Sequence, residues 1–324
     1  MMNPYLKQRA TRCLMALLAA SAAFFAPLGH AQVPLRVTYL PTLDAVPMFI
    51  AIEKGYFAAE GVDLQATPSQ GGAAAIPALM GGAYDIVFSN VVSTFLAQQQ
   101  GFKLRVVAAG TKNIPGSTAS TGLLTRKGDG LRSGKDFEGK SIAVNTRNGV
   151  IWLFARSWVK KTGGDPAKVT FKEIPFPQMT DALRGKQVDG IFTIQPFVNN
   201  ALRDGDVIRT ADPYTEVQPT ADIGHFVATE EYFQKNQDLV RKFSRAMRKG
   251  VQYFNANLGA PDTQKLVATV TKLSPEVVAK LEITQMPERI FVEEYVKTIS
   301  LMVDAGLLKQ NLDPASMVDP VQAQ

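Results

Sequence analysis

Residues 78–87 read Ala-Leu-Met-Gly-Gly-Ala-Tyr-Asp-Ile-Val, and residues 182–191 read Ala-Leu-Arg-Gly-Lys-Gln-Val-Asp-Gly-Ile. Each stretch is typical of a helix end, a glycine turn, an aspartate and the start of a strand. The strands expected before each copy also correspond, residues 35–39 to 141–145 and 62–65 to 169–172. Any α/β protein repeats helix, turn and strand, but several elements in matching order favour an internal duplication and two lobes of similar build.

The first half of the chain alternates short β-prone runs with runs of helical spacing. Strands are predicted at residues 35–39, 62–65, 86–88 and 104–108, and helices through residues 49–52, 76–80 and 94–99. Strands that alternate with helices predict a mostly parallel sheet covered by helices on both faces. We therefore expect an α/β fold.

Two segments are expected to connect the lobes: the extended, apolar residues 121–125, which end in a polar turn, and a second crossing near residues 223–229. Beyond it the spacing is helical only, which predicts a C-terminal helical extension packed on the first lobe. Lobe 1 is then expected to comprise residues 32–123 and 226–324, and lobe 2 to be an inserted unit of residues 124–225.

Residues 1–31 have the pattern of an export signal. Three basic residues precede an apolar stretch, residues 14–28, and small residues at 29–31 suit cleavage. The apolar stretch has about fifteen residues, fewer than the roughly twenty that a membrane-spanning helix needs. This predicts a signal peptide that is cleaved, and a periplasmic mature protein that begins near Gln32.

Cysteine and histidine are scarce in this sequence. Cys13 and His30 lie in the expected signal peptide, so that the mature chain has no cysteine and one histidine, His225. It therefore lacks the residues for disulfides, thiolate chemistry or a multi-histidine metal site, and we expect no metal and no cofactor. Loss of the signal peptide lowers the formal net charge from +6 to +3 with no basic block, so nucleic acid is not an expected partner.

Ligands of open parallel sheets bind beyond the carboxyl ends of the strands, where loops lead into helices. This rule selects small and polar residues as ligand-binding candidates: Thr42, Asp44, Ser69, Gln70, Gly71, Gly72, Ser89, Asn90 and Thr111 in the first lobe, and Asn145, Arg147, Asn148, Gly149, Gln195 and Pro196 in the second. The strongest local pattern is the run of residues 69–72, because small residues let backbone N–H groups at a helix start approach an anionic oxygen. Asn148 and Gly149 form a similar pattern of small residues before the expected helix in the second lobe.

Each candidate also has a structural interpretation, which the sequence leaves open. The glycines make turns, and Ser69 and Asn148 suit helix caps. Asp44 either caps the helix that begins near Pro47 or binds an ammonium group. Arg147 either pairs with a sulfonate or carboxylate or is a solvated surface residue.

Aromatic residues near these loops have the same two interpretations. Phe176 and Tyr214 either stack on an aromatic ligand or belong to the core. Trp152 and Trp158 share one amphipathic helix and are expected to be structural, and burial near the second crossing is expected for His225.

Further segments carry a likeness to a known family: Ala-Ile-Glu-Lys-Gly-Tyr-Phe at residues 51–57, Glu-Gly-Val at 60–62, and Gln195-Pro196 after the strand 191–193. With the two repeats, and in this order, they resemble the periplasmic solute-binding proteins of ABC importers, in the group of aliphatic-sulfonate, taurine, nitrate and thiamine-precursor receptors. The likeness covers nearly the whole mature chain. It implies a type II periplasmic-binding fold, in which two lobes joined by two crossings enclose the ligand.

The resemblance also implies a function. A monomeric extracytoplasmic protein of this kind captures a small polar or anionic organic solute, such as a sulfonate, nitrate or carboxylate, and delivers it to ABC permease subunits in the inner membrane without catalysis. Open alternatives are a receptor for a thiamine-precursor pyrimidine or another heterocycle, and a sensory receptor that signals to a membrane kinase.

Two enzymatic alternatives have little support in the residues. A hydrolase could use Asp44, Ser89 and His225, but the sequence has no Gly-x-Ser-x-Gly elbow. One branch of the superfamily is an enzyme that makes a thiamine pyrimidine from its own histidine and pyridoxal phosphate, and it needs a cysteine-rich iron motif that is missing from this sequence.

Overall fold

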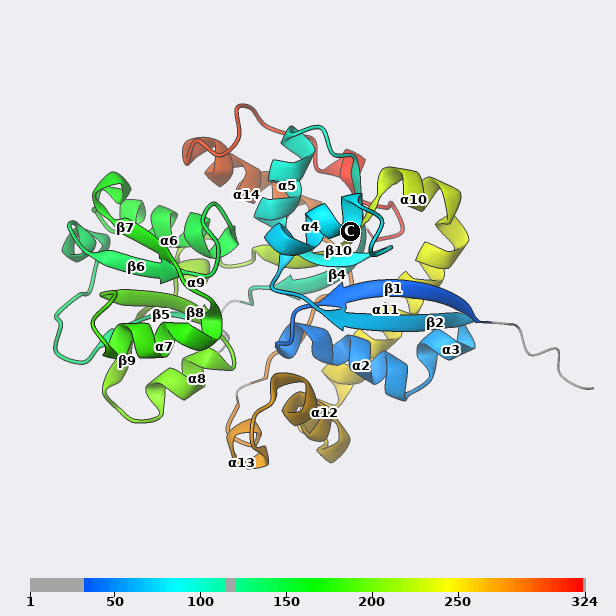
Figure 1. Ribbon diagram of the computed structural model, residues 1–324, viewed down its shortest axis with the longest axis horizontal. Helices are drawn as coiled ribbons and strands as arrows, with labels where there is room; N and C mark the ends of the chain where they lie inside the picture. The colour runs from blue at the N-terminus through cyan, green and yellow to red at the C-terminus, as the bar shows by residue number, and fades with distance from the viewer. Residues whose placement is uncertain (1–31, 115–120, 282, 323–324) are drawn as a thin grey trace, which may run out of the picture. The chain divides into compact units, whose positions relative to one another are not determined.

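The computed structural model describes residues 32–114, 121–281 and 283–322. The expected signal peptide, residues 1–31, lies outside the described residues. From Val33 onward the chain forms one compact unit, in which helices flank two groups of strands (Figure 1). None of the helices in the described ranges combines the length and apolarity that a membrane span requires.

The first group of strands forms the sheet of lobe 1. Its members are β1 (Val33–Tyr39), β2 (Val62–Pro68), β3 (Val87–Asn90), β4 (Leu104–Lys112) and β10 (Asp222–Thr229). β1 pairs in parallel with β2, and β10 lies antiparallel between β3 and β4. A bridge between Val37 and Ile86, with a 3.1 Å hydrogen bond from Thr38 N to the Ile86 carbonyl, joins β1 to β3. The strand order is therefore β2-β1-β3-β10-β4.

The second group forms the sheet of lobe 2, with the strand order β7-β6-β8-β5-β9. Its members are β5 (Thr121–Arg126), β6 (Ser141–Val144), β7 (Thr170–Glu173), β8 (Gly190–Ile194) and β9 (Val207–Ala211). β6 is parallel to β7 and β8, while β5 is antiparallel to β8 and β9. This order equals that of lobe 1 when each strand is replaced by its counterpart. The predicted α/β class, with two mostly parallel sheets, is confirmed.

The aspartates of the two sequence repeats have the same structural role. Asp85 Oδ2 accepts a hydrogen bond from Arg36 N in β1, and Asp189 Oδ2 accepts one from Ser141 N in β6, both at 2.8 Å. Burial alone would raise the pKa of Asp189, but hydrogen bonds from the Ser141 backbone and hydroxyl keep that pKa below its ordinary value. In each lobe the repeat thus ties the turn before the third strand to the first strand.

The two segments expected to connect the lobes, residues 121–125 and 223–229, lie within strands β5 and β10. All of β5 pairs within the lobe 2 sheet, and all of β10 pairs within the lobe 1 sheet. The expected lobe boundaries, after residues 123 and 225, fall inside these strands. Because ladder hydrogen bonds keep a strand in one sheet, we propose to divide the lobes just before Thr121 and just before Asp222.

Helices cover both sheets (Figure 1). Those of lobe 1 before the crossing are α2 (Val46–Glu53), α3 (Tyr56–Ala59), α4 (Gly72–Met80) and α5 (Val91–Gln99). Those of lobe 2 are α6 (Val150–Lys161), α7 (Phe176–Arg184), α8 (Phe197–Leu202) and α9 (Pro213–Val217). Short 3-10 helices follow β1 (Leu43–Ala45) and precede β6 and β7 (Gly134–Phe137 and Pro166–Lys168).

The chain after β10 is helical, as predicted. It contains α10 (Glu230–Lys235), α11 (Gln237–Ala256), α12 (Pro261–Thr271), α13 (Pro275–Val278), α14 (Val292–Asp304) and a 3-10 turn (Ala315–Met317). Helices α11 and α12 pack on α2 of lobe 1, whereas α14 contacts both α5 of lobe 1 and α6 of lobe 2. Helix α13 is short, because the hydrogen bonds that follow it, from Lys280 N and Leu281 N, reach back only three residues and tighten the chain into a turn.

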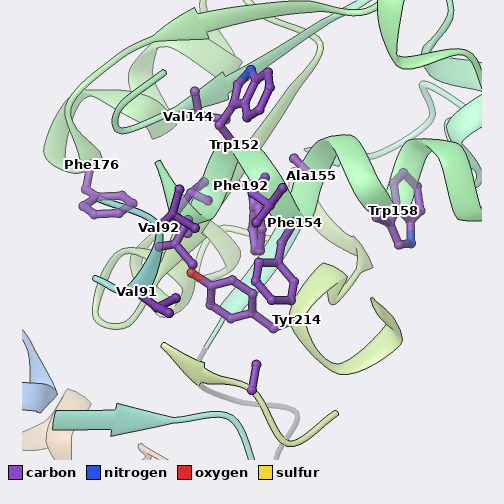
Figure 2. Close-up of a cluster of buried hydrophobic side chains, with 14 of the residues drawn as sticks. Val91, Val92, Val144, Trp152, Phe154, Ala155, Trp158, Phe176, Phe192 and Tyr214 are labelled. Carbon is purple, nitrogen blue, oxygen red and sulfur yellow. The ribbon is translucent and has the colours of Figure 1, made fainter. Parts of the chain in front are cut away.

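One buried apolar cluster runs from lobe 1 into lobe 2. It includes Val91 and Val92 of α5 together with Trp152 and Phe154 of α6 and Tyr214 of α9. Figure 2 shows the two valines among the lobe 2 aromatic side chains. The lobes therefore share packed apolar surface as well as two strand crossings.

Candidate functional site

A cavity of about 100 Å³ lies at the carboxyl ends of the strands, between the two sheets. Lobe 1 contributes the loops after β1, β2, β3 and β4, and lobe 2 contributes the loops after β6, β7 and β8. Ten predicted residues line it: the ligand-binding candidates Thr42, Asp44, Gly71, Gly72, Asn90, Thr111, Asn145 and Gln195, and the aromatic candidates Phe176 and Tyr214. The duplication thus brings matching loops from both lobes to one hollow.

Asp44 reaches the cavity from the 3-10 helix that follows β1. Burial raises the pKa of Asp44, and the hydroxyls of Thr111 and Thr42 lower it in part. These two hydroxyls are near the carboxyl but make no hydrogen bond of good geometry with any described residue. Asp44 does not accept a capping hydrogen bond at α2, whose first turn begins with Val46. The capping interpretation of Asp44 is therefore wrong.

The glycine pair at the start of α4 lets this helix approach β3. Gly71 has a φ of 110°, a conformation that L side chains rarely adopt. A Cβ on Gly72 would lie 2.3 Å from Ser89 Oγ. Both glycines line the cavity, so bare backbone forms this part of its wall.

Asn90 caps α5 at the rim of the cavity. Its Oδ1 accepts a hydrogen bond from Ser93 N at 2.9 Å, and its Nδ2 donates to Ser93 Oγ at 2.9 Å. These two bonds orient the loop after β3, and Asn90 also lines the cavity.

The end of β4 and the residue that follows it contribute two cavity residues that were not predicted from the sequence, Lys112 and Asn113. Asn113 Nδ2 donates to the Pro219 carbonyl at 2.9 Å and to Thr215 Oγ1 at 3.3 Å, which ties the end of β4 to the second crossing. Its buried Oδ1 has no hydrogen-bond partner among the described residues. Their position just past a predicted strand was a usable signal, but the expected site stopped at Thr111.

Lobe 2 supplies mainly aromatic and amide groups. The Phe176 ring stacks on Phe197 with centroids 5.8 Å apart. Tyr214 contacts Phe154 and Phe192 edge-on, and burial raises its pKa well above the ordinary value, with Asp212 and Asp44 adding to the effect. Gln195 Nε2 donates to Asn199 Oδ1 at 2.8 Å. Phe176 and Tyr214 thus belong to the core and also face the cavity, which combines both interpretations.

Several predicted residues do not line this cavity: Ser69, Gln70, Ser89, Arg147, Asn148, Gly149 and Pro196. Ser69 Oγ donates to the Tyr39 carbonyl, and the Gln70 side chain is exposed to solvent. Ser89 is fully buried, where its Oγ accepts from Thr94. Gly149 and Pro196 are buried at the starts of α6 and α8.

The loop after β6 begins at the cavity with Asn145, but its next residues turn away from the cavity. Arg147 and Asn148 are exposed and line a separate hollow of about 240 Å³ beside α4 and α5. Asn148 has a φ of 58°, a left-handed conformation that reverses the chain here, and Arg147 N donates to Glu173 Oε2 at 3.0 Å. Gly71 and Asn148 therefore face different hollows, which sequence spacing alone does not distinguish.

His225 of β10 is fully buried in lobe 1. Its Nε2 is 2.8 Å from Thr94 Oγ1 and its Nδ1 contacts the Tyr295 hydroxyl. Burial lowers the pKa of His225 to about 3. Trp158 is also buried, with Nε1 bonded to Glu216 Oε2 at 2.7 Å. The hydrolase alternative lacks a direct Ser89–His225 contact, since Thr94 lies between them.

A family model described as NMT1/THI5 like matches residues 42–258. The chain belongs to this family. The chain is similar to the riboflavin-binding protein RibY of Chloroflexus aurantiacus. The two are 25% identical over 250 residues, which cover 74% of this chain and 68% of RibY. Another relative is a 4-amino-5-hydroxymethyl-2-methylpyrimidine phosphate synthase of Schizosaccharomyces pombe, 26% identical over 65% of this chain and 63% of the relative.

Solved structures show the fold of this family member. The alkanesulfonate-binding protein SsuA of Xanthomonas axonopodis pv. citri, bound to MOPS, has a TM-score of 0.73 at 18% identity, over 89% of this chain and 99% of that one. The periplasmic nitrate-binding protein NrtA of Synechocystis PCC 6803 has a TM-score of 0.73 at 14% identity, over 88% of this chain and 84% of that one. The periplasmic-binding fold implied by the resemblance is confirmed.

Proposed function

We propose that this protein is the extracytoplasmic solute-binding component of an ABC importer. It captures a small polar solute between its lobes and presents it to permease subunits in the inner membrane. The observation that carries this proposal is a cavity at the strand ends that is lined from both lobes. The sulfonate-binding and nitrate-binding proteins of the same fold support it.

Closure of the lobes around the ligand is the proposed mechanism. Groups from both lobes can contact one solute only when the lobes are together, so a bound solute stabilises the closed form. The cavity of about 100 Å³ is small beside the roughly 300–1,000 Å³ of common ligand pockets. A solute therefore enters when the lobes move apart about the two crossings that lead into β5 and β10.

No catalytic step is part of this proposal. The pyrimidine synthases among the relatives are enzymes, but the mature chain has no cysteine and its single histidine is buried away from the cavity. A receptor for a heterocycle remains a second candidate, favoured by the rings of Phe88, Phe176 and Tyr214 at the cavity and by the name of the riboflavin-binding relative.

A ligand screen with a structural readout tests the function. The purified protein is heated with a panel of sulfonates, nitrate, carboxylates, pyrimidines and flavins, and each compound that raises the melting temperature is examined by small-angle scattering. We expect a binder to add about 2.7 kcal/mol at a hundredfold excess over its Kd, to reduce the radius of gyration and to be recovered unchanged. A binder that leaves the radius of gyration unaltered, or is converted to a product, contradicts the proposal.

A further inference from the structure

The second crossing between the lobes is bonded to the first two turns of α14 by buried polar side chains. Gln218 lies directly after α9 and is buried; its Nε2 donates to the Glu294 carbonyl and its Oε1 accepts from Thr298 Oγ1, both at 3.0 Å. Thr220 Oγ1 donates to Glu294 Oε1 at 2.7 Å. Because α14 also contacts α5 of lobe 1 and α6 of lobe 2, the crossing cannot shift without disturbing this helix.

Two carboxyl groups are buried at this junction, and they are not equally well bonded. Glu294 is 4% exposed and accepts from two side chains of the crossing and from Lys297 Nζ at 2.7 Å. Burial alone would raise the pKa of Glu294, but these bonds keep that pKa below its ordinary value. Asp222, which begins β10, is 2% exposed, and the bond shown at its carboxyl comes from Phe291 N at 2.8 Å. Because like charges in one buried place disfavour each other, Asp222 is the carboxyl that holds a proton.

The titratable and charged groups that face Asp222 come from β4 and α14: Lys112, Glu293, Glu294 and Tyr295. Burial raises the pKa of Asp222 to about 7; the Phe291 N–H and Lys112 lower it in part, and the two glutamates raise it further. The Lys112 ammonium also engages the Phe291 ring, at 3.1 Å from its centroid. Burial raises the pKa of Tyr295 well above its ordinary value, and the Asp222 charge adds to the effect. The groups around Asp222 thus leave its ionised form unfavourable in this arrangement of the lobes.

This junction borders the cavity between the lobes. Ile223 and Gly224, which follow Asp222 in β10, line the cavity, and so does Lys112. When the lobes part, water fills the space between them and reaches this end of β10. A carboxyl in contact with water returns toward its ordinary pKa. The open form therefore releases a proton that the closed form keeps.

We propose that a proton on Asp222 stabilises the closed arrangement of the lobes, and that loss of this proton favours their parting. The inference rests on the solute-binding function proposed above and names a regulation of its closure. The preference for the closed form is complete below about pH 4 and is lost as the pH rises through about 7. One proton changes the closing equilibrium by at most about tenfold per pH unit in this range. The protein is therefore expected to hold a solute more tightly in acidic surroundings.

Small-angle scattering of the mature protein without ligand, at pH 5, 6, 7 and 8 and constant ionic strength, tests this inference. The radius of gyration of the wild type is expected to increase with pH across this range. Asp222→Asn keeps an acceptor for Phe291 N but cannot ionise, so its radius of gyration is expected to stay constant. Glu293→Gln is the matched control, because Glu293 is an exposed carboxylate on the same turn of α14. It is expected to keep the increase, moved slightly toward lower pH, since Glu293 raises the pKa of Asp222.

The Phe291 amide reports on the proton itself, because it donates to the Asp222 carboxyl. Its resonance in nitrogen-15 NMR is expected to shift with a midpoint near pH 7 in the wild type and to stay constant in Asp222→Asn. A radius of gyration that ignores pH in the wild type, or that increases equally in Asp222→Asn, overturns the inference. If Asp222→Asn does not fold, the wild type decides: a shift of the Phe291 amide without a change of radius is the contrary result.

The outcomes also separate this inference from the proposed function. A solute that compacts the protein is expected to bind at least about tenfold more weakly at pH 8 than at pH 5. If such a solute binds equally well at both pH values, the solute-binding function stands and the role of Asp222 in closure is wrong. If the radius of gyration depends on pH through Asp222 but no solute binds, the role of Asp222 stands and the solute-binding function fails.

Discussion

Gly72 and Ser89 illustrate how single residues position this cavity. The start of α4 lies so close to the end of β3 that a Cβ on Gly72 would be 2.3 Å from Ser89 Oγ and 3.1 Å from Asn90 N. Ser89 was predicted to contact the ligand, yet it supports the cavity wall from behind through Thr94. Residues of the loops thus divide into those that face the solute and those that hold the loops together.

Gly72→Ala is expected to destabilise the protein, because the added methyl group would push α4 away from β3. Overpacking of this kind costs about 1–3 kcal/mol. Urea unfolding measures the loss, and Gly259→Ala is the control, since nothing lies within 4 Å of a Cβ at that position. Equal stability of the two variants would contradict the tight packing at Gly72.

The single core histidine gives a second test at the residue scale. Burial lowers the pKa of His225 to about 3, so the ring stays neutral in the folded protein while an unfolded chain binds a proton near pH 6.5. Its contribution to stability is therefore lost as the pH falls below about 6.5. The ring resonances of His225, assigned in proton NMR by their loss in His225→Asn, are expected not to titrate between pH 5 and 8, and a midpoint near 6.5 would contradict its burial.

At the scale of elements, the start of β10 meets the start of α14. Asp222 is 2% exposed and accepts a hydrogen bond from Phe291 N at 2.8 Å. Close by, Glu294 of α14 accepts from Gln218 Nε2 at 2.9 Å and from Thr220 Oγ1 at 2.7 Å. The second crossing is therefore bonded to α14 on both sides of residue 220, so that α14 limits its movement.

Asp222 makes the stability of this junction depend on pH. Burial raises its pKa to about 7 from the ordinary 3.8, against the lowering effects of the Phe291 N–H and Lys112, and Glu294 and Glu293 raise it further. The folded protein thus keeps a proton that the unfolded chain releases, and stability falls as the pH rises from about 4 to about 7. The loss amounts to at most about 4 kcal/mol.

Asp222→Asn cannot ionise, so its free energy of unfolding is expected to decline less than that of the wild type across this pH range. Urea unfolding at several pH values measures the difference. Asp304→Asn, an exposed change on α14, is the control. Parallel curves for the wild type and Asp222→Asn would show that Asp222 is ionised in the folded protein.

At the scale of the whole molecule, the two lobes are joined by apolar packing near the cavity. Val92 at the start of α5 is fully buried in a cluster that includes Trp152, Phe154 and Tyr214 of lobe 2 (Figure 2). Parting of the lobes exposes such surface, and exposure of apolar area is unfavourable. The cluster therefore lowers the free energy of the closed arrangement, to which a bound solute adds its own contacts.

Val92→Asn is expected to shift the protein toward an open form, because the amide is better solvated when the lobes part. Small-angle scattering without ligand should give a larger radius of gyration than the wild type, and the affinity for any cavity ligand should fall. Val296→Asn, at a position 54% exposed on α14, is expected to change neither. Identical scattering of Val92→Asn and the wild type would rule out the valine contact as a closing force.

Local patterns determined much of this architecture. The Gly-Asp repeats, the alternation of strands with helices and the helical C-terminal third could all be read in advance, because hydrophobic periodicity and turn residues act over a few positions. Loops at strand ends were also correct places to search, and Thr42, Asp44, Asn90 and Gln195 were found in that way. Local sequence predicts where strands end, and ligands of parallel sheets bind beyond the carboxyl ends of the strands. The position of the site could therefore be predicted from local patterns.

Tertiary structure alone decided which of those loop residues face the solute. Arg147 and Asn148 leave the cavity because a left-handed turn at Asn148 directs their loop toward α4, and Ser89 is covered by Thr94. Asn113 and Tyr214, far apart in the sequence, reach the same hollow only when the two sheets are joined. Side-chain direction and the partners of a buried group depend on contacts between distant segments, which no local pattern contains.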